Sequence, residues 1–233
     1  MKFKKILFLS IILFAFFSIV WGYQNSTYRH YKGNDLLFMM NNTAFGYSSM
    51  MAYSVYYVFP FLLSLRMFMK KEDAAYITRK KYRSEIFIEK IREIVLFSFL
   101  FAFLHMFVNC LWTFCIVTAS YSKGQFILFS ILNMLGISLF YVSIGIVFLS
   151  IGIKFFQNTA LFITAIFIGT WYFLDKTVFN PVWTPLKDLV ILAQFLDNKL
   201  DFSGLMSIYF RQLCIVGILY IIASFLFKRK EFI

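Results

Sequence analysis

Charged side chains are scarce in this sequence: only 15% of its 233 residues are Asp, Glu, Lys or Arg, while 61% are hydrophobic. A soluble domain of this size cannot bury so much apolar side chain. Several uncharged runs reach the roughly 20 residues that a helix needs to cross the hydrocarbon core of a bilayer. The sequence therefore excludes a soluble domain and predicts an all-α, polytopic integral membrane protein.

Cysteine and glycine are also sparse, and each scarcity excludes a kind of site. The three cysteines, Cys110, Cys115 and Cys214, are odd in number and lie in or beside apolar runs, so they support neither a disulfide framework nor a zinc site. The ten glycines are scattered singly and no G-x-x-x-x-G-K-[ST] motif occurs, so no loop is suited to cradle phosphate. We therefore expect no cofactor, no metal and no catalytic residue on this chain.

Six apolar runs predict six transmembrane helices in a single membrane domain. The first follows the basic start MKFKK, as a secretory signal does, but no small-residue cleavage site follows it, so we expect a span. The second contains Pro60, which is tolerated where neighbouring helices satisfy the freed carbonyl. The predicted spans cover about residues 6–22, 46–69, 94–119, 126–153, 159–174 and 212–227. A charged loop at 70–93 and a longer segment at 175–209 connect them.

The distribution of basic residues predicts the orientation of these spans. With both termini inside, the inner segments hold 16 Lys and Arg residues and the outer segments hold 7, and an excess of cations marks the cytoplasmic side. We therefore predict a multi-pass protein of the bacterial cell membrane with cytoplasmic termini and basic residues in contact with membrane lipids. No nucleic-acid-binding motif is present, so we expect no nucleic-acid partner.

The charged loop at 70–93 contains the stretch YITRKKYRSEIFIEK. Its acidic start suits the first turn of a short helix, and a basic turn follows. The apolar residues after that turn predict an amphipathic helix that continues into the third span as one helix over 86–119. These apolar residues are Ile86, Phe87, Ile91 and Ile94. Two interpretations stay open: a signal for topology that touches lipid headgroups, or a docking surface for a soluble partner.

In this architecture the chain resembles the permease subunits of ABC-2-type ATP-binding-cassette transporters, the small six-span kind found in bacteria. The shared features are the inner loop EDAAYITRKKYRSEIFIEKI, the tight inner turn GIKFFQN between spans four and five, and an outer segment with Pro181, Trp183 and Pro185. A recurrent motif of that family is similar to YITR, in which Tyr, Thr and Arg are followed by basic and aromatic residues. The start MKFKK is too short for the amphipathic helix that precedes span one in larger relatives.

That resemblance implies a type V exporter-like fold, and it implies that ATP hydrolysis and transport are carried out by different chains. ATP and Mg²⁺ would bind separate ABC ATPase subunits, and a second permease copy or a related permease would complete a dimer. The implied cargo is an amphipathic peptide or lipid-like substrate. Small permeases of that family often export antimicrobial or toxic peptides or provide immunity against them. The implied ATPase contacts are Glu72, Asp73, Tyr76, Thr78, Arg79, Lys80 and Lys81. The alternative is a stand-alone immunity protein that binds a peptide without transporting it.

Two polar residues inside the third span are candidates for a site. His105 and Asn109 lie four residues apart, so both are on one helix face, and polar groups at membrane depth usually face partners. They predict either helix packing or, with Tyr53 and Tyr57 of span two, a substrate pathway. The spacing also resembles fragments of CAAX-protease-like metalloproteases. A zinc hydrolase needs about three ligands and a carboxylate, whereas the other histidine, His30, lies in an outer loop.

The segment at 175–209 contains a pattern typical of a short helix. Thr184 is suited to cap its start, and Pro185 suits the first helical position. The apolar residues that follow predict one buried face. These residues are Leu186, Leu189, Val190, Ala193 and Leu196. We therefore expect a short outer helix that dips toward the membrane before span six.

Overall fold

The computed structural model describes residues 2–28, 30–31, 33–43, 45–70, 83–116, 123–179 and 182–229. This part of the chain is all-helical, as predicted, and contains no strand. The elements are α1 (Lys2–Thr27), α2 (Gly33–Asn42), the π-helical η1 (Ala52–Tyr56), α3 (Val58–Phe68), α5 (Arg83–Ile116), α6 (Lys123–Ile151), α7 (Gln157–Thr177), the 3-10 helical η2 (Pro185–Leu189), α8 (Ile191–Leu196) and α9 (Phe202–Lys228).

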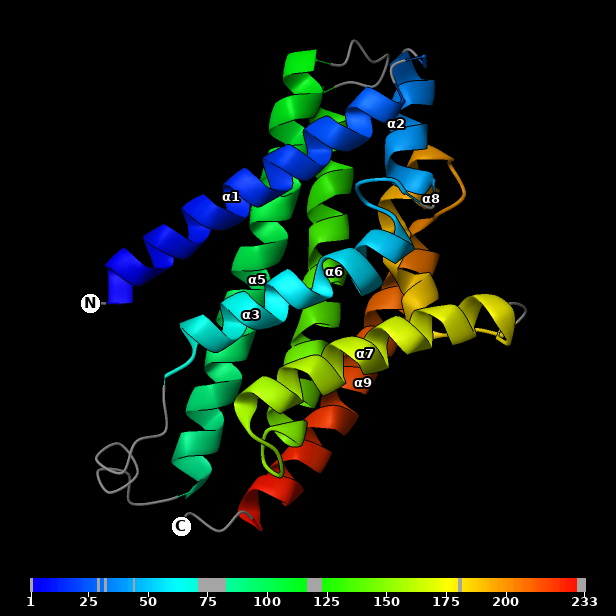
Figure 1. The fold of residues 1–233 in the computed structure, drawn as a ribbon. Coiled ribbons are helices and arrows are strands. Elements are labelled where there is room, and N and C mark those ends of the chain that lie inside the picture. Colours follow the sequence, from blue (N-terminus) through cyan, green and yellow to red (C-terminus); the bar gives the residue numbers. More distant parts are fainter. Residues whose placement is uncertain are drawn as a thin grey trace.

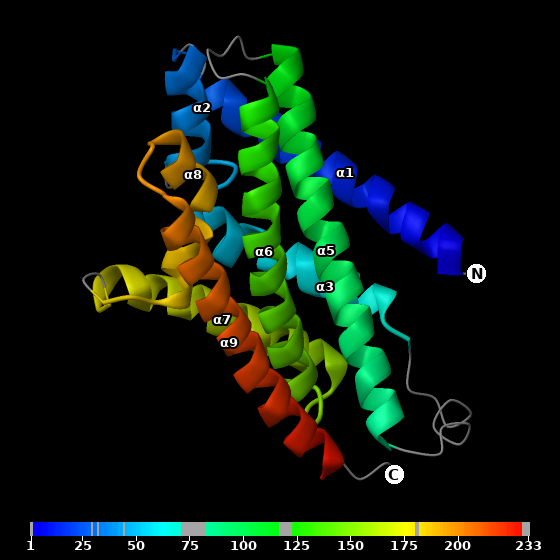
Figure 2. The same cartoon turned by 180° about the vertical axis from the view of Figure 1, so that it is seen from behind.

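Helices α5 and α6 form the centre of the molecule and run side by side along its long axis (Figures 1 and 2). Helix α1 packs on α5, and α9 packs on α6. Helices α3 and α7 pack against each other and cross the central pair obliquely (Figure 1). Helix α5 contacts α1, α3, α6 and α9, and α6 contacts α3, α7, α8, α9 and η2 as well as α5, so the bundle is connected through this central pair.

In the described part of the chain, four helices are long and apolar enough to cross a membrane, namely Lys4–Thr27, Ser84–Ile116, Gly124–Ile151 and Phe202–Lys228. They correspond to the predicted spans one, three, four and six, and they are compatible with a multi-pass membrane protein. The predicted fifth span lies within α7, which is 21 residues long but is not one of these four. The count of six spans therefore stays a prediction.

The predicted second span, 46–69, is not one continuous helix. Its first part is an irregular turn followed by η1, and its last part is the 11-residue α3. Pro60 explains the interruption, because in a continuous α-helix its ring would clash with the carbonyl of residue 56. The chain instead begins a new helix at Val58, which places Pro60 in a first turn, where no N–H donor is needed. A π-helical turn accommodates the change.

The long helix predicted over 86–119 is confirmed as far as residue 116, and residues 117–119 lie outside the described part. Helix α5 is 34 residues long, and the predicted apolar face at its start is packed inward: Ile86, Phe87 and Ile94 are buried and Ile91 is partly buried. The tight turn predicted after span four is also present, since α6 ends at Ile151 and α7 begins at Gln157.

The outer segment differs from its prediction in one respect. Thr184 does occupy the position before Pro185, but its hydroxyl caps no helix N–H and instead donates to the buried carboxylate of Asp175. The predicted helix is divided into η2 and α8. The buried apolar face is confirmed at four of its five positions, with Val190 only partly buried. Thr184 is thus the N-cap residue by position, as predicted, but its hydroxyl is engaged by a carboxylate of α7, nine residues earlier, and not by a helix N–H.

Asp188 fastens this segment to the last helix. Its carboxylate accepts hydrogen bonds from Arg211 of α9 through Nε at 3.2 Å and Nη2 at 2.6 Å, and from Trp183 Nε1 at 3.2 Å. The Arg211 guanidinium also lies 5.2 Å from the centre of the Trp183 ring. Because Asp188 is only 2% exposed, this bidentate pair is well placed to hold η2 against α9.

A close approach of three helices generates a first prediction. A Cβ added at Gly145 of α6 would collide with Ile94 of α5 and touch Leu65 of α3. We expect Gly145→Ala to lower the free energy of unfolding by about 1–3 kcal/mol through overpacking, although alanine otherwise favours a helix interior. Gly217→Ala in α9, where no atom lies within 4 Å of the added Cβ, is the control and should be neutral or stabilising. An unchanged thermal midpoint in mild detergent for Gly145→Ala would contradict the close approach.

Candidate functional site

His105 lies at the centre of a cage of aromatic rings where α5 meets the interrupted second segment. Its ring stacks on Tyr47, with centroids 4.3 Å apart and planes within 11° of each other. The rings of Tyr53, Tyr57 and Phe17 surround it at 5.2, 5.3 and 5.3 Å. The His105 side chain is 2% exposed, so α1, α5 and the segment 47–57 meet at this imidazole.

Hydrogen bonds fix the irregular backbone before η1 to this cage. Tyr47 donates its hydroxyl to the carbonyl of His105 at 3.1 Å, and Nε2 of His105 lies 3.3 Å from the carbonyl of Tyr47. Since a carbonyl can only accept, Nε2 carries the proton. The same Tyr47 carbonyl accepts the hydroxyl of Tyr57 at 3.0 Å. Side chains thus provide hydrogen bonds to the Tyr47 carbonyl, which lies outside a regular helix. A buried backbone carbonyl requires such a partner.

Asn109, one turn further along α5, joins three helices. Its side-chain oxygen accepts the indole N–H of Trp21 of α1 at 3.2 Å, and its amide donates to the side chain of Asn41 of α2 at 3.3 Å. Asn41 in turn donates to the carbonyl of Leu37 at 2.7 Å. Trp21, Asn41 and Asn109 are all at most 2% exposed. This chain of bonds ties α1 and α2 to the same face of α5 that carries His105.

Tyr53 connects the cage to α6. The Tyr53 carbonyl accepts a hydrogen bond from the Tyr141 hydroxyl at 3.0 Å. The Tyr53 hydroxyl accepts a hydrogen bond from the side-chain N–H of Asn133 at 3.2 Å. Within the described ranges, the oxygen of the Asn133 amide and both amide atoms of Gln212 on α9 are buried and have no protein partner. The cage is therefore continuous with polar groups that retain spare hydrogen-bonding capacity between α6 and α9.

The structure thus brings Tyr53, Tyr57 and His105 into one cluster and places Asn109 beside it. All four side chains are at most 2% exposed, so in this conformation they are packed between helices. Sequence reasoning missed their partners, which include Tyr47, Trp21 and Asn41. Asn133 and Gln212 interrupt apolar helices and were visible as polar exceptions, but only the tertiary arrangement shows which helices they face.

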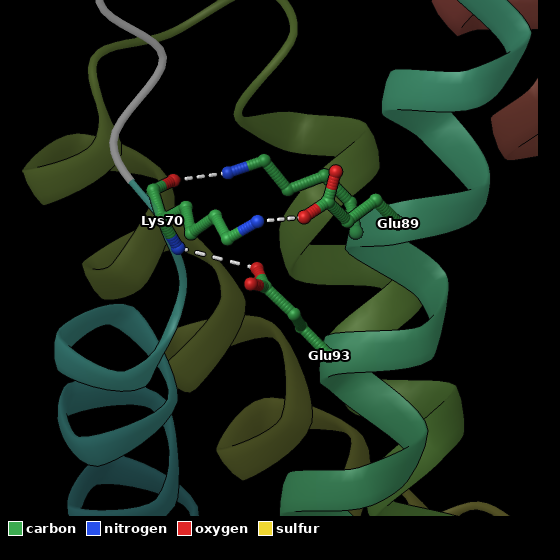
Figure 3. Close-up of polar contacts among 4 residues, drawn as sticks. Lys70, Glu89 and Glu93 are labelled. Atoms are coloured by element: carbon green, nitrogen blue, oxygen red, sulfur yellow. Dashed lines mark hydrogen bonds and ion pairs between the residues drawn. The ribbon is translucent and has the colours of Figure 1, made fainter. Parts of the chain in front are cut away.

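A second polar cluster lies where α3 ends and the charged loop begins. We call it the basal clasp, and Figure 3 shows its contacts. The Lys70 ammonium pairs with the Glu89 carboxylate, and the Lys70 backbone N–H donates to Glu93 at 3.2 Å. The ammonium of Lys90 donates to the Lys70 carbonyl. The basal clasp therefore consists of Lys70 and three residues from about one turn of α5, namely Glu89, Lys90 and Glu93.

The basal clasp is buried on one side: Lys90 is 1% and Glu93 8% exposed, whereas the side chains of Lys70 and Glu89 are 34% and 22% exposed. Buried charges are tolerated where they are paired and hydrogen-bonded. The clasp holds the chain at Lys70 against α5, and the chain re-enters α5 at Arg83. The charged block between these two positions therefore leaves from α5 and returns to α5. The seven predicted contact residues, Glu72, Asp73, Tyr76, Thr78, Arg79, Lys80 and Lys81, all lie outside the described residues.

Neither polar cluster has the composition of a metal site. Across the part of the chain that the structure describes, no group of three or more His, Cys, Asp and Glu side chains is arranged to hold a metal ion. Comparison with protein-family models, with curated proteins and with solved structures found no match to this chain. Its function must therefore be argued from the two polar clusters and the helices that connect them.

The bonds of Asn109 generate a second prediction. Asn109→Leu keeps the volume but leaves the Trp21 donor and the Asn41 acceptor buried without a partner, which we expect to lower the free energy of unfolding by about 1–3 kcal/mol. Adding Trp21→Phe removes that orphaned donor, so the double variant should lose less than the sum of the single losses. Thermal midpoints in detergent measure the three values, with Asn158→Leu on an exposed position of α7 as control. Strictly additive losses would contradict the hydrogen bond.

Proposed function

We propose that this chain is the membrane permease subunit of an ABC exporter that moves an amphipathic substrate outward. ATPase subunits on separate chains would drive it, and a second permease copy or a relative would complete the transporter. The observation that carries the proposal is that both ends of the charged block are attached to the same end of one stiff helix, α5. Lys70 is bonded to α5 through the basal clasp, and residue 83 begins α5 itself.

This attachment suits force transmission from a soluble partner to the membrane. A rigid helix that runs from a docking loop into a bilayer moves as one body when the loop is displaced. Helix α5 extends over 34 residues without interruption, so a push on residues 71–82 would reach His105 and Asn109. A loop that served only as a topology signal would have no need for buried charges hydrogen-bonded to its backbone at its base.

The aromatic cage is the element that such a movement would change. It holds the interrupted segment 47–57 between α1, α5 and α6 through hydrogen bonds to backbone carbonyls. Shifting α5 would separate these partners and expose tyrosine rings together with the spare polar atoms of Asn133 and Gln212. A route with rings and polar atoms side by side suits an amphipathic cargo such as a membrane-active peptide. Two packings of this joint would then correspond to two states of transport.

The outer surfaces of the bundle support a partner in the membrane. In the apolar windows of α1 and α9 only 22% and 17% of the residues are buried, compared with 56% in α5 and 61% in α6. These two helices therefore present apolar faces to lipid or to another membrane subunit. A second permease copy against α1 or α9 would convert a half-transporter into the complete assembly that this proposal requires.

Co-purification tests the proposal directly. The tagged protein, isolated from its native membrane in mild detergent, should bring an ATP-binding-cassette ATPase that mass spectrometry identifies. Arg79→Glu in the charged block should remove the ATPase because it reverses one of the candidate contact charges. Arg92→Glu, the same change at an exposed position of α5, is the matched control and should retain it. If wild-type protein brings no ATPase, the proposal fails and the stand-alone immunity protein becomes the better interpretation.

A charge exchange tests the role of the basal clasp. Lys70→Glu places two carboxylates together and should abolish the stimulation of ATP hydrolysis by cationic amphipathic peptides in the reconstituted complex, while the ATPase still binds. Lys70→Glu combined with Glu89→Lys re-forms the pair and should restore most of the stimulation. Equal loss in the single and double variants would show that the ion pair is not what matters. If no peptide stimulates even the wild-type complex, the peptide substrate class is wrong.

A further inference from the structure

A pocket with basic walls opens where α1, α3, α6 and α7 come together, next to the basal clasp. Its volume is about 380 Å³, within the range of small-ligand sites. Its polar lining comes from four residues on three segments of the chain, and its apolar lining comes mainly from α3 and α6. The lining side chains used in the argument are Lys5, Arg66, Lys70, Gln157, Leu63, Met67 and Phe148.

Among the described residues that line this pocket, the charged side chains are of one sign. Lys5, Arg66 and Lys70 are cations, and this described lining contains no carboxylate. Lys70 is balanced by Glu89 in the basal clasp, whereas Lys5 and Arg66 form no ion pair within the described ranges. Two positive charges therefore share one small cavity without compensation. They would repel each other unless a bound anion lay between them.

The start of α7 adds to this positive field. Gln157, the first residue of α7, lines the pocket. The helix has no acidic residue in its first turn, and no side chain caps it. Its first backbone N–H groups lack helical acceptors, and the aligned peptide dipoles leave partial positive charge at this end. The cavity thus combines two free cations with a helix terminus that is suited to an anion.

The apolar part of the lining indicates which anion. Leu63, Met67 and Phe148 belong to helices α3 and α6, and a free phosphate ion would gain nothing from them. A phospholipid presents a phosphate beside acyl chains, and basic pockets between membrane helices recognise this combination. We propose that this pocket binds an anionic phospholipid, with the headgroup between Lys5 and Arg66 and the first part of an acyl chain against Leu63 and Phe148. The site goes beyond the proposed transport function and does not depend on it.

Such a lipid would bridge three helices. Lys5 lies on α1, Arg66 on α3 and Gln157 at the start of α7. The pocket also borders Lys70, the residue that the basal clasp fastens to α5. Binding therefore would stabilise the arrangement of α1, α3 and α7 around the clasp. The position suits the leaflet with the higher content of anionic lipid, because the predicted cytoplasmic side carries these cations.

Native mass spectrometry of the purified chain tests the site. Wild-type protein should retain phosphatidylglycerol in preference to phosphatidylcholine. The double variant Lys5→Gln/Arg66→Gln should weaken phosphatidylglycerol binding by at least about tenfold, since each cation near a headgroup contributes roughly 1 kcal/mol. Lys228→Gln/Arg229→Gln removes the same charge from exposed positions at the end of α9 and should leave binding unchanged. Equal weakening by both double variants, or none by the first, would overturn the site.

Two further measurements keep the proposal testable if the double variant folds poorly. Gln157→Glu adds a carboxylate at the exposed mouth of the pocket and should weaken phosphatidylglycerol binding, whereas Asn42→Asp, the same kind of change at an exposed position at the end of α2, should not. Inorganic phosphate at millimolar concentration should displace little lipid. If phosphate alone occupies the site and removes the lipid, the ligand is a free anion and the lipid assignment is wrong. Indistinguishable effects of the two acidic variants would also overturn the site.

Discussion

The structure depends on the requirement that no backbone polar group be left without a partner inside a membrane. Where the predicted second span is interrupted before η1, the carbonyl of Tyr47 is outside any regular helix. The hydroxyl of Tyr57 and the imidazole of His105 satisfy it, and the hydroxyl of Tyr141 satisfies that of Tyr53. The irregular segment is therefore possible only because α5 and α6 supply hydrogen-bonding side chains at the right depth.

This requirement also explains why α5 has a central position. The same helix carries His105 and Asn109 at the aromatic cage and Glu89, Lys90 and Glu93 at the basal clasp. Twelve residues separate Glu93 from His105, which corresponds to about 18 Å along a straight helix. Continuous helical backbone therefore joins the clasp to the cage. Under the proposed function, this is the element that would carry a displacement from one cluster to the other.

The periodicity of apolar and polar residues predicted those features of the fold that depend on neighbours within one helix. The continuity of α5, the shared face of His105 and Asn109, and the buried face of η2 and α8 all follow from helical periodicity. The interruption of the second span was not predicted, although Pro60 was visible, because tolerance of proline in a membrane helix depends on neighbours that periodicity does not identify. The partners Trp21, Asn41 and Asp188 were missed for the same reason: each bond joins positions that only tertiary packing brings together.

The basal clasp bears on the two interpretations that the sequence left open for the charged block. Cations that only orient a membrane protein act at the surface, where exposure to water and lipid headgroups costs little. Burying the charges of Lys90 and Glu93 is costly unless each is hydrogen-bonded, and both are bonded to the backbone of Lys70. The clasp defines where the block begins relative to α5. That kind of precision is useful to a surface that must meet a partner in one orientation, and it is superfluous in a loop that merely stays on one side of a membrane.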